Sequence, residues 1–382
     1  MGKEIIVGYL TNNSQLSWNA FKERARIAQS KGVALAFIPS TRQTLRELEK
    51  NNSINSKFWL NSHMSQKEIK IPPVIYDRTN LSRTPKLRSE LIRFFENENS
   101  HFVNSPLFRQ ICSDKWNLVE LLEDSKCNVP YTQIYSPDSL EEMIEITSGR
   151  IFIKKRTASQ GKSQFVVKKT HSKNQFLYAT SEKPEQTYEA RNLSALVKGL
   201  HLLGADSGYI IQQGINADTF DSRVFDYRVI VQKGLDGKNR MTCFYMRIGP
   251  VKSEQANISK KGHPQDPFAV FTDYQSLERR MRKESQKIMQ SISKYNPGEV
   301  GIDFLQDDDG QLSVLEINSK PGSKGIRTLR EWNPTERKYA AIKAIPYEYT
   351  DQIRQRWGRR LNRFLSNPMQ YAKYLVDTHA NE

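Results

Sequence analysis

The sequence contains few cysteines and lacks a long apolar segment. Its three cysteines are an odd number without the close spacing of zinc ligands, which indicates a reducing compartment and no structural zinc; they are Cys112, Cys127 and Cys243. No apolar run approaches the roughly 20 residues that a membrane span needs. The first ten residues also lack the layout of a signal peptide. We therefore expect a cytoplasmic protein with no membrane span.

Motifs of sequence-specific nucleic-acid binding are also missing, although the chain is basic. Its 382 residues carry 58 Lys and Arg against 42 Asp and Glu, a formal net charge of +16. Such a charge suits any polyanion, including a nucleotide. Without zinc-finger spacing, an RRM aromatic signature or a heptad run behind a basic region, nucleic-acid binding would rest on charge alone. We expect no specific nucleic-acid partner. With 10% aromatic residues, the chain should form two or three folded domains.

The first hundred residues alternate between strand and helix patterns. Residues 5–10 and 33–38 are apolar runs, and 17–31 have apolar residues at helical spacing. A further strand is expected at 74–78, after two prolines. The first turn has no G-x-G-x-x-G, so the phosphate-binding turn of a dinucleotide domain is absent. We predict an α/β domain over residues 1–108.

Short apolar or alternating runs, typical of strands, dominate from there to about residue 325. Helical patterns interrupt them near 187–203 and 275–294. A last helical pattern, at about 349–376, has apolar residues on one face and five arginines elsewhere. It predicts a docked helix with a solvated basic face, or a helix that binds a membrane surface or a partner.

The segment from residue 301 to 318 has the pattern of a metal-binding hairpin. Asp309 and Gly310 lie between alternating apolar runs, a strong hairpin signal. A two-residue loop there sets Asp303 opposite Glu316, with Asn318 on the same face. Like charges opposite each other destabilise a sheet, so a cation between them is expected. All-oxygen ligands indicate Mg²⁺ or Mn²⁺. The alternative is an acidic hairpin that faces solvent.

A second hairpin carries opposite charges. Asp236 and Gly237 supply its turn signal, which sets Asp226 opposite Arg247, with Arg228 on the same face. One interpretation is an ordinary cross-strand ion pair. The other is that the aspartate holds guanidinium groups ready to meet phosphate or carboxylate oxygens.

A small-residue segment, 157–163, lies between the apolar runs 151–153 and 165–167. Its backbone N–H groups could approach phosphate oxygens, and Lys154 beside it adds a positive charge. It is not a Walker A loop, because G-x-x-x-x-G-K-[ST] is absent and the segment leads into a strand. An ordinary hairpin turn with exposed lysines is the alternative.

The order of these features resembles the ATP-grasp superfamily, and the match is closest to the YheC/YheD family, described as endospore coat-associated. The resemblance covers residues 109 to about 328. It rests on a helix lysine, a strand lysine with a small-residue loop, an Ile-Gln-Gln-Gly-Ile segment, an Asp-x-Arg pair and an Asp followed by Glu-x-Asn; these are Lys115, Lys154, 211–215, Asp226, Arg228, Asp303, Glu316 and Asn318.

The resemblance implies a role for each matching residue. Lys115 and Lys154 would contact the ATP phosphates, under a mobile loop made by Ser159, Gln160 and Gly161. The nucleotide would also contact the hinge between two subdomains and two further positions: Gln212, Gln213, Gly214, Ile215, Asp226 and Asn257. Arg228 and Arg247 would be the catalytic arginines. The metal ligands would be Asp303, Glu316 and Asn318.

The fold implied by the resemblance is of the α/β (α+β) class. It consists of an N-terminal Rossmann-like α/β domain, a two-subdomain ATP-grasp fold and a C-terminal basic helix. The expected domains are residues 1–108, the first ATP-grasp part 109–211 with the phosphate loop, the second part 212–345 with the metal site, and the basic amphipathic helix 346–382.

The activity implied by the resemblance is an ATP- and Mg²⁺-dependent ligase that joins a carboxylate to an amine through an acylphosphate. Two alternatives stay open: an ATP-binding spore-coat protein without catalysis, and an ATP-grasp phosphotransferase. The expected cofactors are ATP and Mg²⁺ or Mn²⁺, and the partner is a small-molecule or peptide substrate. The basic charge points to an acidic substrate. The resemblance also suggests a homodimer, because ATP-grasp relatives often pair, and association with spores.

Overall fold

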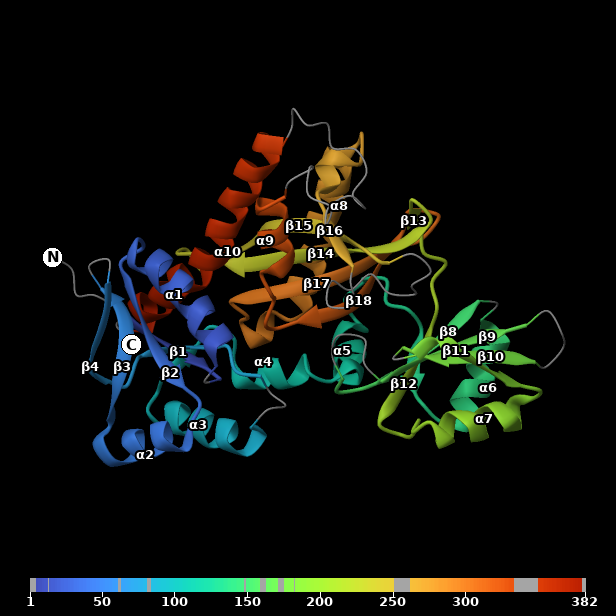
Figure 1. Cartoon of the computed structure of the whole chain (residues 1–382), viewed down its shortest axis with the longest axis horizontal. Helices are drawn as coiled ribbons and strands as arrows, with labels where there is room; N and C mark the ends of the chain where they lie inside the picture. The colour runs from blue at the N-terminus through green and yellow to red at the C-terminus, as the bar shows by residue number, and fades with distance from the viewer. Residues whose placement is uncertain are drawn as a thin grey trace.

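The computed structural model describes residues 5–12, 14–60, 63–80, 84–147, 149–158, 163–170, 175–181, 183–250, 262–332 and 350–379. Within these residues the strands form three sheets (Figure 1). The N-terminal sheet lies at one end of the molecule, the middle sheet at the other, and the third sheet between them.

The N-terminal sheet has the strand order β4-β3-β2-β1-β5-β6. Its strands are β1 (Ile5–Thr11), β2 (Val33–Pro39), β3 (Ser53–Leu60), β4 (His63–Lys70), β5 (Val74–Asp77) and β6 (His101–Phe102). Helices α1 (Gln15–Gln29), α2 (Arg42–Asn51) and α3 (Pro85–Asn97) accompany them. β1, β2, β5 and β6 are parallel, whereas β3 and β4 form an antiparallel hairpin at the edge. The strands and helix expected in residues 5–38 are present.

The middle sheet has the order β11-β10-β9-β8-β12-β7 and is antiparallel throughout. Its elements are β7 (Thr132–Ile134), α6 (Pro137–Ile146), β8 (Arg150–Lys155), β9 (Gln164–Lys169), β10 (Phe176–Thr180), β11 (Lys183–Ala190), α7 (Leu193–Leu202) and β12 (Tyr209–Gln213). The helix predicted at 187–203 was wrong in its first part, because residues through Ala190 extend β11 and the helix begins only after the N-cap Asn192.

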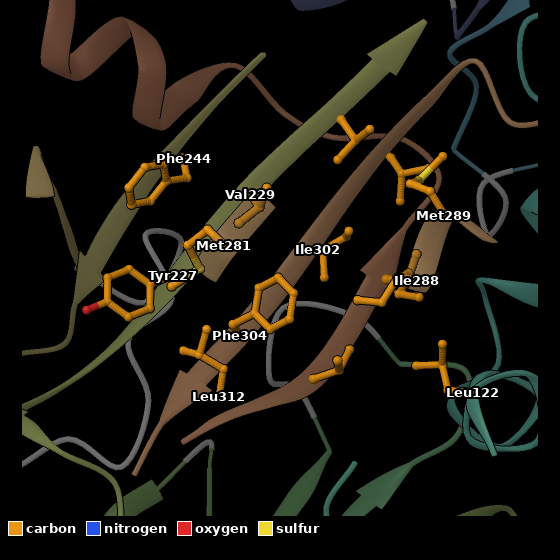
Figure 2. Close-up of a cluster of buried hydrophobic side chains, with 14 of the residues drawn as sticks. Leu122, Tyr227, Val229, Phe244, Met281, Ile288, Met289, Ile302, Phe304 and Leu312 are labelled. Carbon is orange, nitrogen blue, oxygen red and sulfur yellow. The ribbon is translucent and has the colours of Figure 1, made fainter. Parts of the chain in front are cut away.

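The third sheet has the order β16-β15-β14-β17-β18, with β13 paired to β14. Its strands are β13 (Thr219–Phe220), β14 (Arg223–Lys233), β15 (Asn239–Ile248), β16 (His263–Gln265), β17 (Glu299–Gln306) and β18 (Leu312–Asn318). Helices α5 (Lys115–Leu122) and α8 (Tyr274–Ser291) cover one face. Figure 2 shows the core between them, in which Val229 and Ile302 of the strands meet Met281 and Ile288 of α8. This core fixes the strands that carry the expected metal ligands.

The C-terminal helix α10 (Thr350–His379) connects the third sheet to the N-terminal sheet. Trp357 packs with α9 (Lys324–Arg330) and the other face of the third sheet, and Met369 packs with β1 and β2. The expected docking is present, but the basic face is only partly solvated. Arg356 stacks on Phe268 and Tyr274, with its guanidinium carbon 4.6 and 4.7 Å from the ring centroids.

In the part of the chain that the structure describes, no helix combines the length and apolar character needed to cross a membrane.

Candidate functional site

The β17–β18 hairpin places Asp303 directly opposite Glu316, as predicted, but by a different route. Beside the turn, Gln306 pairs with Leu312. A two-residue loop would have paired Gln306 with the next residue, Ser313. The loop is therefore longer than the sequence indicated. A β-bulge that contains Leu315 then shifts the register by one residue and restores the expected pair.

The β14–β15 hairpin shows the same compensation. Lys233 pairs with Asn239 beside the turn, so the expected two-residue loop was wrong here as well. A bulge at Thr242 restores the pairing of Asp226 with Arg247. Both bulges lie between the turn and the charged residues, and they turn the charged side chains of both hairpins to one face of the sheet.

Four charged side chains of the third sheet form one buried network. Arg247 donates to both oxygens of Asp226, at 2.5 and 2.6 Å, and its Nη2 lies 2.9 Å from Oδ2 of Asp303. Arg228 donates to both oxygens of Asp303, with Nη2 to Oδ2 at 2.8 Å. Burial alone would raise the pKa of Asp303, but Arg228 and Arg247 hold it below its usual value. Asp303 is therefore an ionised carboxylate.

Glu316 and Asn318 have unsatisfied polar atoms beside this network. Both are half-buried on β18. Within the described residues Glu316 accepts no hydrogen bond, and Nδ2 of Asn318 is buried without a partner. An amide can present its oxygen in place of its nitrogen by rotating about its last bond. Together with Asp303 these groups make an all-oxygen donor set, which fits Mg²⁺ or Mn²⁺.

Two lysines from other elements face the same region. Lys154 on β8 donates from Nζ to Oε1 of Gln212 at 2.5 Å, and Gln212 is fixed by a 2.9 Å hydrogen bond to Thr132. Burial and repulsion from Lys115 lower the pKa of Lys154 to about 8, although attraction to Glu316 opposes the shift. A neutralised or anion-paired lysine is cheaper to bury than an unpaired cation, so this side chain is suited to an anionic ligand.

Lys115 is the first residue of α5, behind the N-cap Asp114. Its Nζ donates to the carbonyl oxygens of Lys155 and Arg156, at 3.1 and 3.4 Å. Burial lowers the pKa of Lys115, and the field of Glu316 opposes the shift. Glu316 thus acts on both lysines, so the β17–β18 hairpin, the helix α5 and the strand β8 face one site.

The expected hinge begins in the last residues of β12 and continues beyond it. Gln212 is buried, whereas Gln213, Gly214 and Ile215 are half-buried. Gly214 donates its N–H to the Arg150 carbonyl at 2.7 Å, and a Cβ at this position would overlap that carbonyl group. The close approach of two backbones therefore requires glycine here.

We expect Gly214→Ala to destabilise the middle sheet by about 1–3 kcal/mol, because the backbone must move away from Arg150. Urea unfolding measures this cost. Gly358→Ala is the control: nothing lies within 4 Å of its added carbon, and alanine favours a helix interior. Equal stability of the two variants would contradict the close approach at Gly214.

Four of the predicted site residues, Ser159, Gln160, Gly161 and Asn257, lie outside the described residues. Of the residues that the structure describes, Thr132 is one that the sequence did not reveal. It orients Gln212 from a neighbouring strand, and only the β12–β7 pairing brings the two together. Lys320 is another, and it lies just beyond the Glu-x-Asn pattern.

Comparisons with known proteins bear on the family and the fold of the chain. Residues 104–353 match the family model described as YheC/D like ATP-grasp. The curated Endospore coat-associated protein YheD of Bacillus subtilis (strain 168) is 22% identical over 269 residues, or 67% of this chain and 58% of that protein. The chain therefore spans less than two thirds of the length of this relative.

Solved structures are similar over most of the chain. The ADP complex of N5-carboxyaminoimidazole ribonucleotide synthetase has a TM-score of 0.56 at 11% identity, and the match covers 90% of this chain and 78% of that one. A RiPP-associated ATP-grasp ligase from Chryseobacterium gregarium, in complex with ADP and a leader and core peptide, has a TM-score of 0.52 at 12% identity, with coverages of 94% and 96%. The predicted α/β class and ATP-grasp fold are confirmed.

Proposed function

Because this chain belongs to the YheC/D like ATP-grasp family, we propose that it is an ATP- and Mg²⁺-dependent ligase that joins a carboxylate to an amine through an acylphosphate. The observation that carries the proposal is the convergence of Glu316 with Lys115 and Lys154, from three separate elements. Two half-buried lysines lie beside a carboxylate and an amide nitrogen that have no hydrogen-bond partner among the described residues, and this arrangement suits a metal-bound polyphosphate.

Asp303, Glu316 and Asn318 would hold the divalent ion. When bound, Mg²⁺ supplies positive charge that neutralises the phosphates. Lys115 and Lys154 would bind phosphate oxygens, while Gln212 holds Lys154 in position. The segment from Gln212 to Ile215 would border the nucleotide base. Ser159, Gln160, Gly161 and Asn257 remain predicted members of the phosphate site.

The two arginines take different parts in the proposal. Arg228 is the more accessible, with 14% of its side chain exposed against 7% for Arg247. It would hold the transferring phosphoryl group and the acyl acceptor. Arg247 already spans Asp226 and Asp303, so it would add positive charge while it keeps Asp303 aimed at the metal position. Asp226 takes part by orienting Arg247.

The reaction proceeds in two displacements. A carboxylate oxygen of the first substrate attacks the γ-phosphorus of ATP, so a new O–P bond forms and the bond to ADP breaks. The amine of the second substrate then attacks the acyl carbon, phosphate leaves with the electron pair of the C–O bond, and the amine loses a proton. No protein nucleophile is needed, so the chain contributes positioning and charge.

The test is release of ADP and phosphate from ATP across a matrix of carboxylates and amines, with mass spectrometry of the products. We expect stoichiometric ADP and phosphate only when a carboxylate and an amine are both present, together with a dehydrated adduct. A stable phosphorylated product without an amine would identify a phosphotransferase instead. Nucleotide binding without turnover across the whole matrix would contradict the ligase proposal.

The coat-associated relative favours a second candidate, an ATP-binding protein of the spore coat without catalysis. The peptide-bound ligase similarly favours a peptide as the substrate. We therefore include acidic peptides in the matrix. Independently of the ligase activity, we also propose that the protein associates with spores and that it forms a homodimer. Size-exclusion chromatography with light scattering tests the homodimer.

We expect Lys154→Met to weaken ATP binding about tenfold or more, ~1.4 kcal/mol, because it removes a buried positive charge. With its pKa at about 8, Lys154 loses its proton as the pH rises above 8, and a bound phosphate would draw it back. ATP binding to the wild type should therefore weaken above pH 8 and take up a proton there. Calorimetry in buffers of different ionisation enthalpy measures this uptake.

The neighbouring Lys155→Met is the matched control, since its side chain points to the other face of β8 and is exposed. Lys154→Met should abolish the proton uptake and Lys155→Met should retain it. If ATP binding to Lys154→Met still took up a proton, the group that titrates would be a residue other than Lys154.

A further inference from the structure

A second group of cations is buried where the N-terminal sheet meets the third sheet. It lies around the carboxyl end of β5 and also includes residues of α3, α4 (Pro106–Ile111), β17 and the segment after β18. The group contains four cations, Arg78, Arg88, Arg109 and Lys320, and two carboxylates, Asp77 and Glu299. In this part of the described chain Asp77 and Glu299 counter two of the three arginine charges, so one positive charge remains, and the Lys320 amine lies beside it. Burial and the neighbouring arginines lower the pKa of Lys320 to about 7.

The carboxylates are already engaged with arginines. Asp77 pairs with both Arg88 and Arg109, and together they hold its pKa near 2 although burial raises it. Glu299 pairs with Arg78, at 2.6 Å, and accepts a 3.0 Å hydrogen bond from Tyr76. The Arg78–Glu299 pair joins the N-terminal sheet to the third sheet, whereas both Asp77 pairs tie β5 to segments that follow it in the chain. Within the described residues the Lys320 amine contacts carbonyl oxygens and no carboxylate.

Two cations converge on one carbonyl oxygen. The Thr79 carbonyl accepts from Nη2 of Arg109 at 2.7 Å and from Nζ of Lys320 at 2.8 Å. Lys320 also contacts the Arg78 carbonyl at 3.3 Å. Within the residues that the structure describes, Nε of Arg109 is buried without an acceptor, and this side chain is only 2% exposed. A carbonyl dipole does not neutralise the excess positive charge of this group, so the burial of that charge is costly without a further anion.

The position of this group suits a ligand. β1 and β5 are adjacent parallel strands, and the chain leaves β1 toward β2 on one side and returns to β5 on the other. This is the switch point of a parallel sheet, where ligands bind beyond the carboxyl ends of the strands.

The group is also next to the proposed metal site. Lys320 follows Asn318 by two residues. Arg78 donates to the Pro321 carbonyl at 3.0 Å, and Pro321 and Arg228 both flank Gly301, at 3.1 and 3.5 Å from where its Cβ would lie. Arg78 therefore contacts a residue that lies beside Gly301 and Arg228, so the second group of cations and the proposed metal site are neighbours.

We propose that Arg78, Arg109 and Lys320 form a binding site for an oxyanion of the amine substrate, a carboxylate or phosphate that takes no part in bond formation. The site would hold that group while the amine faces the acyl carbon beside Arg228. The ligand class is an amine with a second anionic group, such as an amino acid or a phosphorylated amine. The role in the reaction rests on the proposed ligase function, but the binding does not.

The experiment measures oxyanion binding by calorimetry on the full chain, with saturating ADP and Mg²⁺ so that phosphate-binding groups of the nucleotide site are occupied. The probes are inorganic phosphate and the amino acid glutamate, each against chloride. Lys320→Gln is the test variant, because Lys320 contacts carbonyl groups and its removal leaves no carboxylate unpaired. Lys324→Gln, an exposed lysine with the same change of charge, is the control.

We expect at least one probe to bind the wild type and Lys324→Gln equally, and at least tenfold more weakly to Lys320→Gln, while the ADP affinity of all three agrees within twofold. Preference for phosphate would indicate a phosphorylated amine, and preference for glutamate a carboxylate. No binding of either probe to the wild type, or equal binding to Lys320→Gln, would overturn the site.

Crystals soaked in selenate provide a measurement that needs no variant. The selenium signal should lie within hydrogen-bond distance of Lys320 Nζ. A signal confined to the region of Lys115 and Lys154 would overturn the proposal. Because none of these readouts requires turnover, a failed ligase assay with a positive binding result would reject the reaction and keep the site.

Discussion

Glu316→Ala should reduce metal-dependent ATP turnover by about 10²–10³-fold, the effect typical of losing a group that stabilises charge in the transition state. Glu316 is half-buried and accepts no hydrogen bond within the described residues, so its carboxylate has no hydrogen-bond partner to lose. It also lies opposite the ionised Asp303, and removing a like charge relieves repulsion. The variant should therefore fold as stably as the wild type. Steady-state ADP release over a Mg²⁺ titration measures the loss.

Asp309→Ala is the matched control for this variant. Asp309 is exposed in the turn of the same hairpin, so its replacement removes the same charge and leaves the proposed metal ligands in place. Its turnover should equal that of the wild type, and Glu316→Gln should behave like Glu316→Ala because an amide oxygen binds Mg²⁺ more weakly than a carboxylate. Wild-type turnover in Glu316→Ala at low Mg²⁺ would remove this residue from the metal site.

The two hairpins explain why the central pairs of the site were predictable from the sequence. The Asp-Gly signals locate both turns, and period-2 alternation then restricts which side chains can share a face. Each loop is longer than predicted, but a bulge at Leu315 or Thr242 corrects the register before the charged residues are reached. A register error of one residue would have turned Asp303 away from Glu316. The same error would also have moved the apolar side chains of the strand out of the core, which disfavours it.

Other parts of the fold gave no comparable signal. β3 and β4 form an edge hairpin in which Ser53 and Ser56 are buried, so the segment has no clear apolar alternation. Ser56 is stabilised by donating to the Phe37 carbonyl at 2.9 Å, a contact with a neighbouring strand. Tertiary hydrogen bonds of this kind override local propensity, and sequence patterns do not report them.

The oxyanion site depends on contacts between segments far apart in the chain. Thr79 and Lys320 meet only because Asn104 joins the N-terminal sheet to β17 and β18. Its amide donates to the carbonyls of Glu299 and Ser319, at 2.8 and 2.6 Å, and accepts from the Gly298 N–H at 2.8 Å. In the sequence each of these cations is one of 58 basic residues, and none has a local pattern that separates it from a surface lysine or arginine.

Arg247→Met should cost about 3–5 kcal/mol of unfolding free energy, the range for breaking a buried ion pair by removing one partner. Arg247 is 6% exposed and satisfies both oxygens of Asp226. Without it Asp226 is a buried carboxyl group that has lost its partner next to Asp303, where burial and Asp303 both raise its pKa, and Asp303 retains only Arg228. Urea unfolding measures the loss. Because the cost arises from an unpaired carboxylate, the double variant Asp226→Asn/Arg247→Met should recover more than half of it.

Arg240→Met tests whether burial causes this cost. Arg240 pairs with Asp236 at the turn of the same β14–β15 hairpin, but that pair is exposed, with 58% and 40% of the two side chains accessible. Exposed ion pairs contribute little, since water solvates the partner that remains. We expect its urea midpoint to stay close to that of the wild type. If Arg240→Met and Arg247→Met lost equal stability, or if Asp226→Asn failed to rescue Arg247→Met, the network would be held by packing and not by charge. Asp303 would then owe its orientation to its place on β17, and the proposed positioning role of Arg247 would be rejected.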